Sequence, residues 1–216
     1  MGKLFVIEGT DGSGKSTQFK LVCENLEKQG IPFRKIVFPR YTEESSALIR
    51  MYLGGAFGTS PDAVNAYAAS TFFAVDRYAS YKTDWGKDYE AGELIICDRY
   101  TTSNAVHQAA KLPEDQVDAF LDWLFHYEYE LLGIPAPSKV FFLDIPSEIT
   151  FDLLKKRQGD SGDIHELDHD YLIRCKNNAN SVCDKLSWQR VSCVQDGKLR
   201  TPEEINADIM RMILEQ

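Results

Sequence analysis

The sequence predicts a three-layer α/β fold, in which helices surround a five-stranded parallel sheet. Two observations support this prediction. Five short apolar runs alternate along the chain with segments whose apolar residues recur at helical spacing, and no stretch repeats another. In addition, a glycine-rich turn follows the first apolar run and leads directly into the first helical pattern. Strands that alternate with helices form parallel sheets covered on both faces.

Each apolar run has the length of a buried strand, and each helical segment begins or ends at a turn or capping signal. The expected strands are residues 4–7, 33–38, 94–97, 139–145 and 190–194. The expected helices are residues 15–29, 44–53, 61–84, 101–110, 113–132, 147–156 and 168–186, with a last helix that Thr201-Pro202-Glu203-Glu204 caps. No linker divides the chain, so we expect one domain over residues 1–216.

The glycine-rich turn carries the phosphate-binding motif G-x-x-x-x-G-K-[ST], written here Gly9-Thr10-Asp11-Gly12-Ser13-Gly14-Lys15-Ser16 and followed by Thr17. In this P-loop, backbone N–H groups turn inward around phosphate oxygens, and the start of the following helix adds its positive dipole end. Lys15 can reach the terminal phosphates, and the Ser16 hydroxyl can bind Mg²⁺. The alternative is a glycine-rich turn with no ligand, which the full pattern in its strand–helix context disfavours.

Composition restricts the class of ligand. The formal net charge is −9, whereas proteins that bind polymeric DNA or RNA usually present a basic face, so we expect no nucleic-acid polymer as partner. The chain shows no signal peptide and no apolar run long enough to span a membrane. Its five cysteines are widely spread without a C-x-x-C pair, which favours a reduced cytoplasmic protein.

Two further groups of polar residues follow expected strands. Residues 39–41 follow the second strand, and Asp98-Arg99-Tyr100 follows the third. Because the carboxyl ends of parallel strands meet at one edge of a sheet, both groups should converge with the P-loop on one ligand site. Asp98 is placed to face Mg²⁺ near the phosphates, or else it caps the next helix. Arg99 could hold a second anionic group.

The middle and late parts of the chain add a helical pair and a polar loop. Phe73 and Arg77 lie one turn apart on the helix expected at 61–84, a pair that core packing would also explain. A short polar stretch with two glycines covers about residues 157–166, and we expect it to be a loop that opens and closes. His165 and His169 have a spacing that can hold a metal, although their polar surroundings favour a loop.

Among P-loop proteins, a GTPase would carry an N-K-x-D motif, which is absent, whereas the small size and the second anion site fit a nucleoside monophosphate kinase. The sequence resembles the bacterial thymidylate kinases along nearly its whole length. The matching segments are Glu8 to Thr17, Phe38-Pro39-Arg40-Tyr41, Phe73-Ala74-Val75-Asp76-Arg77, Asp98-Arg99-Tyr100-Thr101-Thr102-Ser103-Asn104, and the pair Asp163 and Glu166.

The resemblance implies transfer of the γ-phosphoryl group of ATP to dTMP, with Mg²⁺ as the metal. It implies that Phe73 stacks on the thymine ring, that Arg77 binds a base carbonyl and that Asn104 binds the base N–H edge. It assigns the dTMP site to Asp11, Arg40, Tyr41, Phe73, Arg77, Arg99, Ser103, Asn104, His107 and Glu166. It assigns metal contacts to Ser16, Asp11 and Asp98, and catalytic roles to Lys15, Asp11 and Arg99.

Two positions depart from the family pattern. The P-loop has Gly12 and Ser13 where some members carry a catalytic arginine, so we expect the catalytic cation to be Arg157, with Lys155 and Lys156 as the alternatives. His107 stands where relatives usually carry a tyrosine near the sugar, which leaves deoxyribose selectivity open.

The resemblance also implies a homodimer, and the wide apolar sector of the helix expected at 61–84 is compatible with one, although internal packing would explain it too. Two alternative functions remain at this stage. One is a kinase for another pyrimidine nucleoside monophosphate, and the other is a nucleotide-binding protein without transfer activity.

Overall fold

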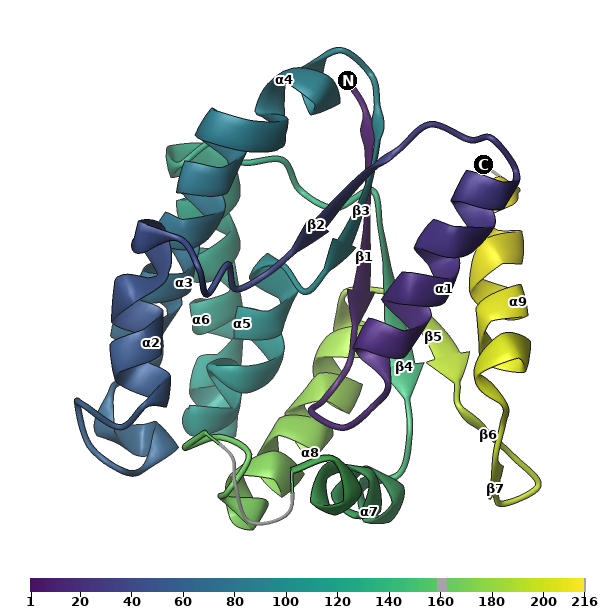
Figure 1. Ribbon diagram of the computed structural model, residues 1–216. Coiled ribbons are helices and arrows are strands. Elements are labelled where there is room, and N and C mark those ends of the chain that lie inside the picture. The colour runs from purple at the N-terminus through teal and green to yellow at the C-terminus, as the bar shows by residue number, and fades with distance from the viewer. Residues whose placement is uncertain (159–162, 216) are drawn as a thin grey trace.

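The structure is a computed structural model that describes residues 1–158 and 163–215, without the side chains of Arg157 and Gln158. Five parallel strands form the central sheet in the order β2-β3-β1-β4-β5, which confirms the predicted fold class. Figure 1 shows the sheet between two layers of helices. The strands are β1 (Lys3–Glu8), β2 (Arg34–Val37), β3 (Leu94–Asp98), β4 (Lys139–Asp144) and β5 (Gln189–Ser192).

The alternating side chains of β1 build a core on each face of the sheet. Phe5 and Ile7 pack in a cluster with residues of α1 (Lys15–Lys28) and α9 (Pro202–Leu214), the helices that cover one face. Leu4 and Val6 point to the opposite face, where Trp85 and Tyr100 join their cluster. The helices on that side are α3 (Ala66–Ser80), α4 (Gly86–Glu90), α5 (Thr101–His107), α6 (Glu114–Phe125) and α8 (His169–Lys185).

The carboxyl ends of the strands point toward the lower edge in Figure 1, where the P-loop joins β1 to α1. Helix α7 (Ser147–Gln158) lies below this edge, and α2 (Ala47–Leu53) flanks α3. The remaining helical turns are Glu44–Ser46, Pro61–Ala63, Tyr81–Trp85, Ala109–Lys111 and His126–Leu131. No helix in the described part of the chain is long and apolar enough to cross a membrane.

The prediction of one helix over residues 61–84 was wrong at both ends. Pro61–Ala63 is a separate 3₁₀ turn, and α3 begins only after Asn65, whose side chain accepts a hydrogen bond from the backbone N–H of Ala68. At the other end, the helical path continues through a π turn and α4, because residues 81–91 contain no proline, and it ends before Gly92, whose φ is 101°.

A two-stranded hairpin was missed. Strands β6 (Val194–Gln195) and β7 (Lys198–Leu199) pair antiparallel just before α9. The turn between them is Asp196-Gly197, and both residues have positive φ, 51° and 73°. Asp-Gly between two short strands is a strong hairpin signal, so the sequence did contain this element. The predicted capping box at the start of α9 is confirmed, with Thr201 and Glu204 binding each other's backbone N–H.

Candidate active site

Two cavities open at the carboxyl end of the sheet, and Asp11 and Arg99 line both of them. The space between the atoms, with the open solvent at the mouth included, is about 610 Å³ in one cavity and about 1110 Å³ in the other. The smaller one, which we call the acceptor cavity, is lined by Asp11, Phe38, Pro39, Tyr41, Leu53, Phe73, Arg77, Arg99, Tyr100, Ser103, Asn104, His107, Gln108, Asp163, His165 and Glu166. The larger one, the donor cavity, is lined by Asp11, Gly12, Ser13, Gly14, Lys15, Ser16, Thr17, Gln18, Arg99, Ile145, Leu153, Cys193, Leu199, Arg200, Pro202 and Ile205.

The P-loop forms the floor of the donor cavity. Gly12 and Gly14 have φ of 78° and 85°, a backbone conformation that glycine adopts without strain and that aims the loop's N–H groups inward. The ammonium of Lys15 donates hydrogen bonds to the carbonyl oxygens of Gly9 and Thr10, both at 2.8 Å. Burial lowers the pKa of Lys15 to about 8. The loop therefore holds a desolvated ammonium group beside the backbone N–H groups that would bind phosphate.

Asp11 and Arg99 form an ion pair between the two cavities. Burial alone would raise the pKa of Asp11, but the charges of Arg99 and Lys15 hold it well below the usual range. Arg99 has a φ of 63°, which is uncommon for a residue with a side chain and tends to occur at functional sites. Any molecule in the acceptor cavity and any molecule in the donor cavity would meet at this pair.

Oxygen atoms that suit Mg²⁺ lie beside the P-loop. Asp98 is buried at the end of β3, and its Oδ1 has no hydrogen-bond partner among the described residues. Ser16 lines the donor cavity. Mg²⁺ in nucleotide sites uses one or two protein oxygens together with phosphates and water, so these two residues fit the ion. The described residues contain no cluster of three or more histidine, cysteine, aspartate or glutamate side chains that could hold a metal on its own.

Arg77 is fixed in the wall of the acceptor cavity by a carboxylate that the sequence analysis did not identify. Its Nε and Nη2 each donate to one oxygen of Glu128 at 2.6 Å, and both side chains are almost completely buried. Thr101 donates a further hydrogen bond to Glu128, at 2.8 Å. Burial disfavours the charged form of Arg77, but the charge and the hydrogen bonds of Glu128 favour that form more strongly, so the pKa of Arg77 is raised.

Asn104 has a defined orientation in the same wall. Its amide nitrogen donates to the carbonyl oxygen of Ser70 at 3.2 Å and to Glu128 at 3.4 Å. The amide oxygen is therefore the atom that remains to accept a hydrogen bond from a ligand. Phe73 lines the cavity beside Asn104 and packs edge-on against Tyr52. An aromatic face, a donor and an acceptor thus converge in one cavity.

His107 and Ser103 complete the wall near Arg99. The Nε2 atom of His107 lies 3.2 Å from Nη1 of Arg99, and burial lowers the pKa of His107 to about 3. Because arginine only donates hydrogen bonds, Nε2 of the neutral ring accepts and Nδ1 carries the hydrogen. Nδ1 is buried and has no partner among the described residues. Ser103 donates to the buried carboxylate of Glu8 at 2.8 Å.

Arg40 lies outside the acceptor cavity wall, although Tyr41 lines it. The backbone N–H of Arg40 donates to Asp76 at 2.9 Å and its Nε to the same carboxylate at 3.2 Å, while Ser45 donates at 2.6 Å. Asp76 is completely buried on α3 and so fixes the turn that follows β2.

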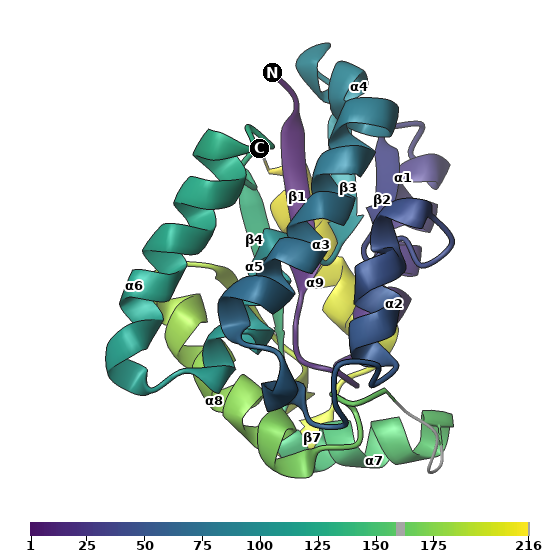
Figure 2. The same cartoon turned by 90° about the vertical axis from the view of Figure 1, so that its left-hand side faces the viewer.

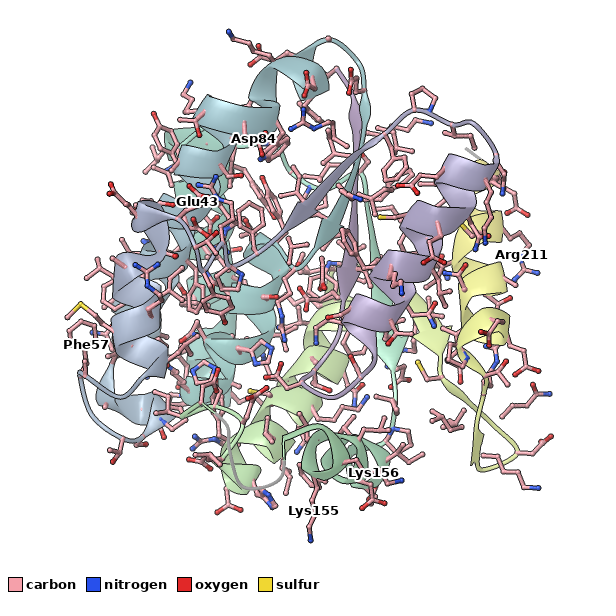
Figure 3. All side chains as sticks on the ribbon, viewed as in Figure 1. Glu43, Phe57, Asp84, Lys155, Lys156 and Arg211 are labelled. Carbon is pink, nitrogen blue, oxygen red and sulfur yellow. The ribbon has the colours of Figure 1, made fainter. Side chains whose placement is uncertain are left out.

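The late loop is only partly described. Asp163 and Glu166 line the acceptor cavity, as does His165, which lies 2.7 Å from the Tyr52 hydroxyl. The predicted catalytic residue Arg157 is in α7, and its side chain lies outside the described part of the structure. Lys155 and Lys156 are exposed, and Figure 3 shows Lys155 pointing away from the molecule.

Three carboxylates that organise this site were missed as site residues. Glu8 and Asp76 both stood inside the segments that match the family. Each directly follows an apolar run, which was the available signal, because a carboxylate in such a place is seldom buried without a partner. Glu128 lies between Tyr127 and Tyr129 in a helical stretch that also contains His126 and Glu130. Nothing in that stretch indicated that the helix would reach the cavity.

Comparison with known proteins gives a consistent family. The thymidylate kinase family model matches residues 7–201. A thymidylate kinase from Mycobacterium tuberculosis strain H37Rv is 32% identical over 163 residues, which cover 74% of each chain. A probable thymidylate kinase from Pyrococcus abyssi is 27% identical over 98% of this chain and 96% of its own.

The solved structure of thymidylate kinase from Candida albicans shares the fold, with a TM-score of 0.74 at 23% identity over 99% of this chain and 92% of that one. With the fold, the P-loop and the paired cavities in place, the chain belongs to the thymidylate kinase family, phosphotransferases that convert dTMP to dTDP with ATP.

Proposed function

We propose that the chain binds dTMP in the acceptor cavity and ATP in the donor cavity, and that phosphoryl transfer takes place between them at Asp11 and Arg99. The observation that carries this proposal is that these two residues line both cavities. Transfer between two bound nucleotides requires the reacting phosphates to be held close together and in line. We propose that the whole chain acts as one catalytic domain.

In this proposal, base recognition rests on three residues. Phe73 stacks on the ring, Arg77 donates to a base carbonyl and the Asn104 amide oxygen accepts from the adjacent base N–H. Within the described part of the chain, Nη1 of Arg77 donates a single hydrogen bond, to the Tyr100 carbonyl at 3.3 Å, so its other hydrogen is available to a ligand. Thymine and uracil present a carbonyl beside an N–H, whereas cytosine presents an amino group beside an unprotonated nitrogen. The pair therefore favours thymine or uracil over cytosine.

Phosphoryl transfer rests on cations. Arg99 and Tyr41 receive the acceptor phosphate, Arg40 supports the turn that carries Tyr41, and Ser103, His107 and Glu166 surround the rest of the nucleotide. Asp11 orients Arg99 and Lys15 through its charge. Lys15 leaves its two loop carbonyls to bridge the donor and acceptor phosphates, and Arg157 supplies the further cation for the transferred group.

The P-loop from Gly9 to Thr17 holds the phosphates of ATP, and the donor base extends toward Leu199 and Arg200 at the far wall of the donor cavity. Ser16 and Asp98 are the proposed protein contacts of Mg²⁺, directly or through water. When bound, the ion would neutralise charge on the β- and γ-phosphates. Asp11 was also expected to help place the ion, and that role remains a prediction.

The test is ADP formation that depends on dTMP. With Mg-ATP, the wild-type protein should release one ADP for each dTDP formed, and Lys15→Met should abolish the reaction while the protein stays folded. Exposed Lys20, in the same helix, gives the matched control Lys20→Met, which should keep full activity. Binding of both nucleotides without ADP formation would instead indicate a binding protein without transfer activity.

We also propose that the chain works in the cytoplasm as a homodimer that pairs through α2 and α3, the helices in front of the sheet in Figure 2. Tyr67, Val75 and Tyr78 are 37–45% exposed along one stripe of α3, and Leu48 and Met51 of α2 are also exposed. Sedimentation should give twice the chain mass for the wild type and a shift toward the single-chain mass for Val75→Glu.

A further inference from the structure

A short turn, Asp163 to Glu166, brings two carboxylates to the wall of the acceptor cavity. The backbone N–H groups of His165 and Glu166 donate to Oδ1 of Asp163 at 2.9 Å and 3.0 Å, which orients that carboxylate. The backbone N–H of Ile164 donates to the carbonyl oxygen of Leu53 on α2, at 3.3 Å. The turn is thus attached to α2 by its backbone and by the Ile164 side chain, which packs against Ile49 and Leu53. The side chain of His165 adds a polar contact with Tyr52 of α2.

His165 is 6% exposed and its Nε2 lies 2.7 Å from the hydroxyl of Tyr52. Tyr52, on α2, is completely buried, and Lys111 donates to the same hydroxyl oxygen at 2.6 Å and to the carbonyl oxygen of Val64 at 3.1 Å. The Lys111 ammonium also lies 4.8 Å from the centre of the Tyr52 ring. Three elements distant in sequence therefore meet at one hydroxyl group.

The direction of these hydrogen bonds follows from the groups involved. An ammonium only donates, so the Tyr52 oxygen accepts from Lys111 and its own hydrogen must go to another acceptor. The Pro61 carbonyl accepts from the Tyr52 hydroxyl at 3.1 Å, and His165 Nε2 lies 2.7 Å from the same oxygen. Burial holds the pKa of His165 well below its usual value, so the ring is neutral and shares one hydrogen with the Tyr52 hydroxyl group.

Neither Tyr52 nor Lys111 lines the acceptor cavity, whereas His165, Asp163 and Glu166 do. Resting on the proposed function, we propose that Tyr52 and Lys111 are positioning residues for the acceptor nucleotide. Through His165 they hold the carboxylates of Asp163 and Glu166 where hydroxyl groups of the bound sugar can donate to them. They touch neither substrate and contribute to the binding of the acceptor but not of the donor.

The test compares Tyr52→Phe, which keeps the packed ring and removes the hydroxyl, with Tyr81→Phe. The Tyr81 hydroxyl donates a hydrogen bond to the carboxylate of Glu90 at 3.0 Å, and neither Tyr81 nor Glu90 lines the acceptor or the donor cavity. Tyr52→Phe and Lys111→Met should each raise the KM for dTMP roughly tenfold, the effect of about one lost hydrogen bond, with the KM for ATP unchanged. His165→Gln, whose amide oxygen can accept from Tyr52, should restore more dTMP affinity than His165→Leu.

A second measurement needs no substrate. Hydrogen exchange of the Ile164, His165 and Glu166 amides in the free protein should become faster in Tyr52→Phe and stay unchanged in Tyr81→Phe. An unchanged KM for dTMP together with unchanged exchange would overturn the positioning role, and an equal rise in both KM values would show a general structural defect instead. If the wild type fails to phosphorylate dTMP, the proposed function is wrong, and the exchange result still decides whether Tyr52 and Lys111 hold the turn.

Discussion

Single residues in the acceptor cavity depend on buried charges for their orientation. Glu128 binds Arg77 through both carboxylate oxygens and also accepts from Thr101 and Asn104. Two of the proposed base-reading groups, a donor and an acceptor, are therefore positioned by one carboxylate. Removing one member of a buried ion pair leaves the other charge uncompensated, which costs more than an exposed pair would.

Glu128→Gln should lower the free energy of unfolding by about 3–5 kcal/mol and raise the KM for dTMP, because Arg77 loses its charged partner. Urea denaturation and steady-state kinetics measure the two effects. Glu130, two residues along the same π turn, is 72% exposed and pairs with His126, so Glu130→Gln is the matched control and should change the stability by under about 1 kcal/mol. Equal effects of the two substitutions would contradict the role given to Glu128.

Arg157→Ala should lower kcat by a factor on the order of 10² to 10⁴ and leave both KM values within about threefold, because the interaction is made mainly in the transition state. Stopped-flow measurement of ADP formation gives the rate of the chemical step. Lys155→Ala, at an exposed position in α7, should leave kcat unchanged. If Arg157→Ala retains its kcat while Lys155→Ala or Lys156→Ala loses it, the catalytic cation is one of the lysines.

At the scale of elements, α7 packs on the P-loop and explains why the loop has glycine at position 12. A Cβ on Gly12 would lie 2.7 Å from the carbonyl oxygen of Thr150 and 2.8 Å from the Leu154 side chain, both on α7. No side chain fits there without moving the helix, so an arginine at this point of the loop is excluded sterically. The predicted role of Arg157, on α7, is consistent with this exclusion and remains a prediction.

Gly12→Ala should therefore lower the free energy of unfolding by more than the strain of a left-handed backbone conformation alone. Gly30 has a similar φ, 68° against 78°, but a Cβ there meets no atom within 4 Å. Gly30→Ala should lower the free energy of unfolding by roughly 1–2 kcal/mol, the cost of a left-handed conformation, whereas Gly12→Ala adds a collision and should cost clearly more. Urea denaturation of both variants measures the difference, and equal values would show that α7 does not constrain the loop.

Much of the fold could be predicted from the sequence because its signals are local. All five strands of the sheet were found, since each is a short apolar run between turns. The start of α3 was predicted too early, because Ser60 caps only the short 3₁₀ turn and a second cap, Asn65, starts the α-helix five residues later. The end of the same helix ran on through a π turn, for which the sequence carries no comparable signal.

The site was predictable where it follows strand ends and not where helices converge on it. The P-loop, Tyr41, Asp98 and Arg99 all follow strands, and the parallel topology brings them to one edge. Glu128 and Tyr52 come from helices whose contact with the site depends on how those helices pack. Long-range packing of this kind has no local pattern, which is why the residues that position the acceptor site were missed.

At the scale of the whole molecule, Asp11 and Arg99 line two cavities, in which we propose that the two nucleotides bind. The donor side is built from a motif that binds any nucleoside triphosphate, so selectivity has to come from the acceptor side. There, Arg77, Asn104 and Phe73 line the cavity, and in the proposed function they select the base. His107 stands near the expected position of the sugar.

The most direct test of this account is kcat/KM for a panel of nucleoside monophosphates, namely dTMP, dUMP, UMP and dCMP, measured with saturating Mg-ATP. The account predicts the lowest value for dCMP, because cytosine reverses the hydrogen-bonding pattern that Arg77 and Asn104 recognise. It predicts the highest value for dTMP, the substrate of the thymidylate kinase family. A higher kcat/KM for dCMP or UMP than for dTMP would contradict it.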